Sequence, residues 1–324
     1  MVVQRVDETF TIWLQTEGCL PSYVLAPLWG LHLPAELRLQ LDTETLVRPV
    51  TREDVEALFN PLPSFPVVSI LVPLVPRNEL VHIQHVIEYR PRNCSDPTVD
   101  SCDRGIQRVL MAFRCIFGAK ITSSWLAVMS DVPVPMVAGR VVHPPYRGPY
   151  GNSGNAMWDN EQEADLHRIY SALGHLERDS RLRIALRWYN KAADQSEVKD
   201  RLLSAWIGLE ALYGGGDKGE IVHKLSLRAA FYLSKYATGF PNVNETFQTL
   251  KNLYEFRSSV VHGDTRQKRN QLGDAADRAM EILRLTLRAA LIKKEQFPPA
   301  DKLANKLDED IRNALTKVND LLKD

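Results

Sequence analysis

The segment LKNLYEFRSSVVHG, Leu250 to Gly263, decides how the second half of the chain is interpreted. Its apolar residues recur at helical spacing, and a glycine just past the last of them is the usual end of a helix. Arg257 occupies a step on the apolar ladder, and His262 follows five residues later. Because packing alone would require neither side chain, we expect this helix to carry chemistry as well as part of a core.

A second amphipathic segment, Val198 to Gly216, interrupts its apolar ladder in the same way. The ladder passes from Leu203 through Trp206 to a carboxylate, Glu210. A buried charge costs several kcal/mol unless it is paired and hydrogen-bonded. Two opposite charges on the apolar faces of two helices therefore predict that Glu210 contacts Arg257.

The composition indicates an ordinary globular protein. The 324 residues exceed the usual size of one core, so two domains are expected. Lys plus Arg and Asp plus Glu both total 40, and this balance argues against nucleic-acid binding through a bulk positive field, although a local basic patch stays open. The four cysteines lack metal-site spacing, so reduced thiols are expected, with Cys115 packed within a helix. No metal and no cofactor are expected.

No segment predicts association with a membrane. The longest apolar run, Phe65 to Pro76, is too short to span a bilayer and is interrupted by prolines. The first residues, MVVQRVDETF, lack the hydrophobic core of a signal peptide. A cytoplasmic protein is the resulting expectation.

Proline divides the chain into two parts. Sixteen of the 19 prolines lie within residues 1–150, so short strands, helices and loops are expected there, and long helices after it. The change falls at His143 to Asn155, a loop-like segment. We therefore predict an α+β N-terminal domain of unknown role over 1–150, and an all-α helical bundle over 156–324 that ends in an amphipathic helix.

Hydrophobic periodicity gives the expected elements. Strands are predicted at Pro66–Val75, Leu80–Arg90, Ser123–Ser130 and Ala138–Pro144, with a helix at Arg104–Gly118. Later helices are predicted at Ala164–Asp179, Val198–Gly216, Glu220–Tyr236, Asn244–Gly263, Gly273–Lys294 and Asp301–Asp324. Asn244 or Glu245 is expected to cap the helix that carries Arg257.

Two segments together resemble a known family. AWIGLEALYGGGDKGEIVHKLSLRAAFYLS, Ala205 to Ser234, followed by LKNLYEFRSSVVHG, is similar to the Apea-like branch of the HEPN superfamily (higher eukaryotes and prokaryotes nucleotide-binding). The resemblance implies an all-α HEPN-like domain that dimerises, with an Arg-x4–6-His motif forming a composite site across the interface. It also implies a metal-independent endoribonuclease of the kind found in phage defence or toxin systems.

The resemblance assigns roles to particular residues. Arg257 and His262 match the catalytic pair, with Glu210, Arg228, Ser258 and Asp264 in supporting positions. Ser258 departs from many HEPN nucleases, which have asparagine or another polar residue directly after the motif arginine. Ribonucleolytic chemistry suits the pair, because RNA carries its own 2′-hydroxyl nucleophile, imidazole moves protons near neutral pH, and guanidinium binds phosphate in bidentate fashion. If Arg257 is instead held by Glu210, its role becomes orientation of the site, and the phosphate contact comes from the partner chain or from Arg228.

The spacing of the pair predicts a dimer. Five helical steps place His262 about 140° around an ideal helix from Arg257. Two helices that meet about a two-fold axis would bring both pairs to one cleft, and a distorted last turn would narrow the angle instead.

Basic residues near the motif complete the predicted site. Arg266, Lys268 and Arg269 are expected to guide RNA, although a solvated loop explains them equally well. Lys224 is a further RNA-binding candidate, for which a surface role outside the cleft is the alternative. Two other functions stay open: a non-catalytic module that binds RNA or a nucleotide, and a helical dimerisation or assembly protein. The N-terminal domain is expected to receive a protein partner or a trigger.

Overall fold

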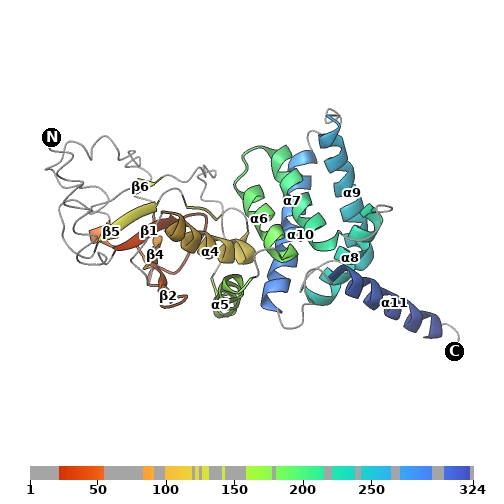
Figure 1. The fold of residues 1–324 in the computed structure, drawn as a ribbon, viewed down its shortest axis with the longest axis horizontal. Coiled ribbons are helices and arrows are strands. Elements are labelled where there is room, and N and C mark those ends of the chain that lie inside the picture. Colours follow the sequence, from red (N-terminus) through yellow and green to blue (C-terminus); the bar gives the residue numbers. More distant parts are fainter. Residues whose placement is uncertain are drawn as a thin grey trace. The chain divides into compact units, whose positions relative to one another are not determined.

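A computed structural model describes a sheet with one long helix in the first part of the chain and a helical region in the second (Figure 1). The described residues are 22–54, 83–90, 99–118, 121–123, 126–130, 141–142, 158–176, 180–214, 221–237, 242–263, 271–293 and 303–321. The chain divides into two compact units, Met1–Leu110 with Lys120–Asp159, and Met111–Ala119 with Asn160–Asp324. The expected order, α+β and then helical, is confirmed at this level.

The first unit is built on an antiparallel sheet with strand order β2-β3-β4-β1-β5-β6. The strands are β1 (Ser22–Leu28), β2 (Leu39–Gln40), β3 (Thr45–Pro49), β4 (His85–Tyr89), β5 (Leu126–Ser130) and β6 (Val141–Val142). Strands β4, β5 and β6 fall within predicted strand segments, whereas β1, β2 and β3 were not predicted. The predicted strand at Pro66–Val75 and the loop at His143–Asn155 lie outside the described residues.

Strand β4 lies inside the sheet and is covered on both faces. Val86 and Ile87, which are adjacent and point to opposite faces, are both fully buried. The alternation of residue types along this segment had predicted only one buried face. The next residue, Glu88, is also buried, and its carboxylate is paired with an arginine. The Arg48 Nε donates to Glu88 Oε2 at 2.6 Å, and Arg48 also pairs with Asp54. Burial here is therefore compatible with charge because the charges are matched.

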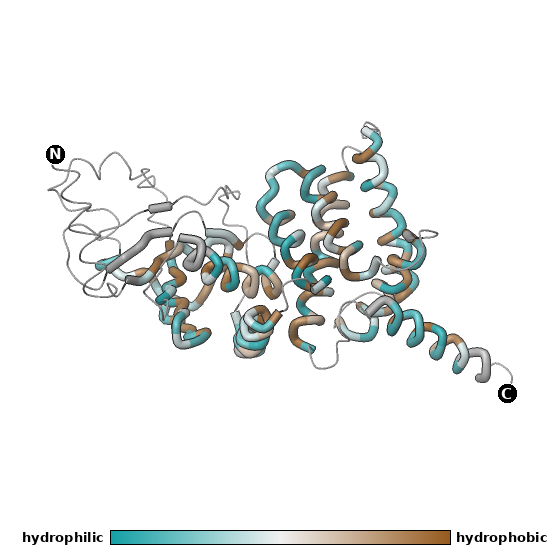
Figure 2. The backbone as a smooth tube through the Cα atoms, viewed as in Figure 1, coloured by the Kyte–Doolittle hydropathy of each residue, from teal (hydrophilic) through white to brown (hydrophobic). Residues whose placement is uncertain are grey.

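The second unit consists of helices that pack around α10 (Leu272–Ile292). The others are α5 (Asn160–Gly174), α6 (Arg181–Ala193), α7 (Val198–Tyr213), α8 (Ile221–Tyr236), α9 (Val243–Val261) and α11 (Leu303–Leu321). The predicted helices are confirmed, and α6 is an addition that the sequence analysis missed. Hydrophobic residues are prominent along α10, whereas α11 is largely hydrophilic (Figure 2).

Helices α7 and α10 approach each other closely at Gly208. A Cβ atom added to Gly208 would lie 2.6 Å from Leu283 Cδ2 of α10, so this position of α7 admits no side chain without rearrangement. This close contact fixes the position of the end of α7, which carries Glu210, relative to α10.

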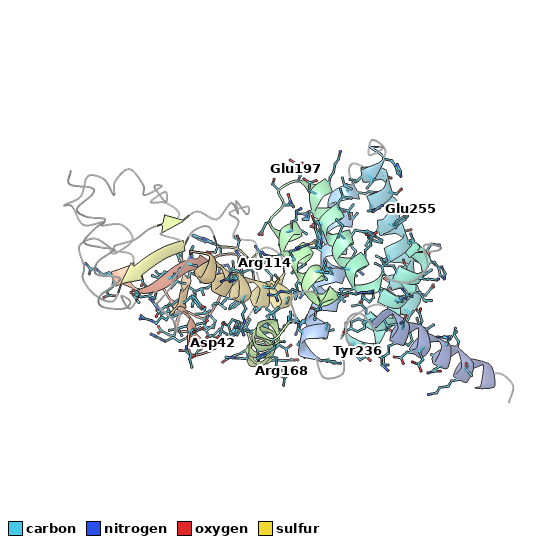
Figure 3. The ribbon with its side chains drawn as sticks, in the orientation of Figure 1. Asp42, Arg114, Arg168, Glu197, Tyr236 and Glu255 are labelled. Atoms are coloured by element: carbon cyan, nitrogen blue, oxygen red, sulfur yellow. The ribbon has the colours of Figure 1, made fainter. Side chains whose placement is uncertain are left out.

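The long helix α4 (Val99–Phe117) ends among the helices of the second unit, which includes residues 111–119. Arg114 donates to Asp194 Oδ1 at 2.7 Å, and Arg284 donates to the carbonyl oxygen of Ile116 at 2.6 Å (Arg114 is labelled in Figure 3). The last carbonyl groups of α4 thus receive a cationic partner. Cys115 is a free, buried thiol in this turn, as predicted, and burial raises its pKa to about 12.

Candidate functional site

The predicted contact between Glu210 and Arg257 is present. Arg257 Nη2 lies 3.8 Å from Glu210 Oε1, which joins the end of α7 to the last third of α9. The same carboxylate oxygen accepts a hydrogen bond from Trp206 Nε1 at 2.8 Å. Because Trp206 is 1% exposed and one turn before Glu210, the indole fixes the carboxylate against the bundle. The ladder spacing in the two helices therefore predicted a real tertiary pair.

Tyr254 completes this cluster. Its ring centroid lies 5.7 Å from that of Trp206, and the Arg257 Cζ lies 5.9 Å from the Tyr254 ring centroid. The distance is at the outer limit of a cation–π contact. Arg257 is thus placed between a carboxylate and an aromatic ring, and both partners orient its guanidinium.

The degree of burial differs from the expectation. The Arg257 and Glu210 side chains are 29% and 34% exposed, whereas a core-facing step had been predicted. The buried residues of α9, Thr246, Leu250 and Leu253, all precede this turn. The end of α9 therefore lies at the edge of the packed region, and Arg257 keeps access to solvent. A phosphate group could reach a guanidinium in this position.

His262 lies at the C-terminal end of α9 and is exposed. Its backbone N–H donates to the carbonyl oxygen of Ser258 at 3.0 Å, a helical i to i−4 bond. The backbone turns at Gly263, where φ is +78°. The helical bond to Ser258 reaches His262, and an ideal helix places its side chain about 140° around the axis from Arg257.

The cap at the other end of α9 is Asn242, rather than the predicted Asn244 or Glu245. The Asn242 side chain accepts from the backbone N–H of Glu245 at 2.9 Å, which is the N-cap to N3 bond. The helix begins earlier than its apolar pattern indicated, because Val243 opens the first turn before the ladder of buried residues starts.

Arg228 has partners that the sequence analysis did not anticipate. It is 4% exposed, donates to the carbonyl oxygen of Tyr213 at 2.9 Å, and forms a bidentate pair with Asp308 of α11 at 2.8 and 2.7 Å. Lys224, one turn earlier on α8, lies close enough to Asp308 to contribute to lowering its pKa, after the larger effect of the Arg228 hydrogen bond. Both basic residues therefore face α11.

The structure leaves part of the predicted site untested. Asp264, Arg266, Lys268 and Arg269 lie outside the described residues. Ser258 is half-buried, and its carbonyl oxygen accepts the bond from His262. Trp206 and Tyr254 were missed as site residues, although their spacings to Glu210 and Arg257, four and three residues, are those of neighbours on a helix surface.

Comparisons with known proteins leave the family assignment open. No family model, curated protein or solved structure matches the chain. In the part of the chain that the structure describes, no helix is long and apolar enough to cross a membrane. Over the same residues, no group of three or more His, Cys, Asp or Glu side chains is arranged to hold a metal ion.

Proposed function

We propose that the protein is a metal-independent endoribonuclease of the HEPN type, with Arg257 and His262 as its catalytic pair. The observation that supports this most is the end of α9, where an oriented and accessible arginine is followed, five residues later, by an exposed histidine. The contact between Glu210 and Arg257 was predicted from the two ladders, and the resemblance places Arg257 in the catalytic pair and Glu210 in a supporting position.

The residue types fit cleavage of RNA by its own 2′-hydroxyl group. His262 would move a proton to or from the reacting oxygens, and Arg257 would stabilise the negative charge that develops on the phosphate. Glu210 and Tyr254 act as positioning residues, because they contact the guanidinium and would not touch the RNA.

A homodimer is part of the proposal. The regular helical bond at His262 keeps the two catalytic side chains on different sides of α9, so one chain does not bring them together. Two copies of α9 that meet about a two-fold axis would place the arginine of one chain beside the histidine of the other. Exposed Val261, 53% accessible between these positions, is suited to such a contact.

The test is incubation of purified protein with mixed RNA in EDTA. We expect cleavage by the wild type, loss of cleavage in His262→Ala and Arg257→Ala, and retained cleavage in His175→Ala and Arg187→Ala. His175 is a matched control because it is exposed and directly follows the end of α5, and Arg187 is an exposed arginine of α6. Folding and dimerisation are measured for each variant by circular dichroism and light scattering.

The remaining outcomes separate the other two functions. RNA binding without cleavage by the wild type would indicate a non-catalytic module in which the same side chains bind RNA or a nucleotide. Loss of the dimer in His262→Ala, with the fold intact, would indicate that the motif organises an interface. The first result would overturn the proposed ribonuclease, and the second would overturn it when the wild type also cleaves no RNA. If the protein cleaves RNA, its role in phage defence or in a stress response can be tested next.

A further inference from the structure

Helix α8 carries a row of basic side chains on one face. Lys224, Arg228 and Lys235 are four and seven residues apart, so they lie within about 40° of one another around the helix axis. Two acidic residues of α11 cover this row. Asp308 forms the bidentate pair with Arg228, and Asp310 Oδ2 lies 3.1 Å from Lys235 Nζ.

Two lysines and one aspartate meet at the end of this row among the residues that the structure describes. Tyr236, labelled in Figure 3 at the end of α8, has Lys235 Nζ at 5.2 Å and Lys293 Nζ at 5.6 Å from its ring centroid. Two ammonium groups thus gather around one half-exposed aromatic ring, and Asp310 is the acidic partner of one of them. An aromatic ring beside cations is the usual combination for binding single-stranded nucleic acid.

Helix α11 is held to this face mainly by charge. Within residues 305–317, whose side chains are described, Leu307 is the one buried residue, at 2% exposed. Burial of this leucine contributes about 2 kcal/mol to docking of the helix. Beyond this turn α11 extends away from the other helices of its unit (Figure 1), and Leu315 is 59% exposed. A polyanion that displaces α11 would therefore have to break few hydrophobic contacts.

The carboxylate of Asp308 occupies the position that a phosphate group would take. Arg228 presents Nε and Nη2 to both carboxylate oxygens, and the same fork binds phosphate in bidentate fashion. A further bond, from Nη1 to the carbonyl oxygen of Tyr213, belongs to the bundle and does not involve α11. The guanidinium is thereby already oriented for an anion.

We propose that the basic row of α8, with Lys293, is a binding site for the phosphate backbone of single-stranded RNA, and that α11 is its displaceable acidic cover. The choice of RNA rests on the proposed function, whereas the site and its cover rest on the ion pairs. RNA that displaces Asp308 and Asp310 binds where α11 lay, so the cover lowers the affinity of the resting protein for RNA.

The test measures binding of a short fluorescein-labelled oligouridylate by anisotropy, in a His262→Ala background so that cleavage does not intervene. Asp308→Asn with Asp310→Asn removes the negative charge of the cover and keeps an oxygen that accepts from Arg228. We expect about tenfold tighter binding, because two charge-assisted contacts become available. The slope of log K against log salt should steepen by about 1.4, or 0.7 for each phosphate contact on a single strand.

The matched control is Glu309→Gln with Glu197→Gln, which changes the net charge equally at two exposed positions. An equal gain in this control, or no gain in the aspartate variant, would overturn the proposal. Adding Lys224→Gln and Lys235→Gln to the aspartate variant should cancel the gain, and a gain that persists would also overturn it. Amide exchange provides a second readout, since saturating oligouridylate should reduce protection in α11 of the His262→Ala protein that retains both aspartates.

The two proposals fail separately. Tighter binding in the aspartate variant of a protein that cleaves no RNA would support the covered site and reject the ribonuclease. Cleavage that requires His262, together with unchanged binding in the aspartate variant, would support the ribonuclease and reject the covered site.

Discussion

Glu210 Oε1 lies 3.8 Å from Arg257 Nη2 while it accepts a hydrogen bond from Trp206 Nε1. One oxygen atom thus links the fully buried part of α7 to the accessible end of α9. Two side chains that are both about one-third exposed gain little from Coulomb attraction. The pair is therefore better suited to orient Arg257 than to stabilise the fold.

A double-mutant cycle tests this interpretation. Glu210→Gln and Arg257→Gln, alone and together, should give a coupling in the free energy of unfolding of less than about 1 kcal/mol, as for other partly exposed pairs. Urea denaturation provides the measurement. Glu210→Gln should strongly lower the rate of RNA cleavage while it changes the free energy of unfolding little. The glutamine amide keeps the Trp206 bond but leaves Arg257 without its charged partner Glu210. A coupling of several kcal/mol would instead make the pair structural.

Arg228 should contribute more to stability than any other residue of the basic row. Its side chain is 5% exposed and satisfies the Tyr213 carbonyl group, whereas Asp308 is 40% exposed. Breaking a fully buried pair costs 3–5 kcal/mol, and the exposure of Asp308 reduces this to about 2 kcal/mol for Arg228→Met. Lys235→Met, at a side chain that is 45% exposed, should cost less than about 1 kcal/mol. Equal costs in urea denaturation would contradict this difference.

His85 makes the first unit sensitive to pH. The side chain is buried, and its Nε2 lies 3.1 Å from the carbonyl oxygen of Pro34, so the neutral ring donates from Nε2. Burial lowers the pKa of His85 below its ordinary value of 6.5. As pH falls through 6.5, the unfolded chain takes up a proton before the folded one does. The free energy of unfolding should therefore decrease from about pH 6.5 downward, until the folded pKa is passed.

Amide exchange in β1 and β4, corrected for intrinsic rates, reports this decrease. His85→Gln keeps a donor for the Pro34 carbonyl group and removes the titration. The variant should lose less protection than the wild type between pH 7 and pH 5. If both proteins lost protection equally, other groups of the unit would account for the pH dependence.

The spacing of residues along the sequence predicted the helices and the contact between Glu210 and Arg257. It did not predict features that depend on packing between segments distant in sequence. Apolar ladders gave the contact of Glu210 with Arg257, because steps of three and four residues mark one helix face. They gave no measure of exposure, which depends on where neighbouring helices end. The pairing of Arg228 with Asp308 joins residues 80 apart in sequence, so no local pattern could reveal it.

Of the four elements that were missed (β1, β2, β3 and α6), β1 and α6 show why. Strand β1 contains Pro27, and a proline argues against an inner strand. The strand tolerates it because pairing of β1 with β5 runs only over Ser22–Leu25 in the described residues, so Pro27 pairs with β4 alone. Helix α6 carries three arginines, Arg181, Arg183 and Arg187, which alternate with its first apolar residues and obscure the helical period, although five residues of the helix are buried.

Gly263 should control how α9 ends beside His262. Its φ of +78° is a left-handed conformation, and its N–H donates to the carbonyl oxygen of Val260 at 3.3 Å. Among the described residues, an added Cβ would meet no atom within 4 Å other than those of its chain neighbours, so the expected cost of substitution there is conformational. Gly263→Ala should lower the free energy of unfolding by about 1 kcal/mol, and Gly263→Asn by less, because asparagine tolerates the left-handed region. RNA cleavage should follow the same order, since a helix that frays at its last turn releases the bond between His262 and Ser258. Equal stability of all three proteins would show that this end of α9 is not set by the glycine.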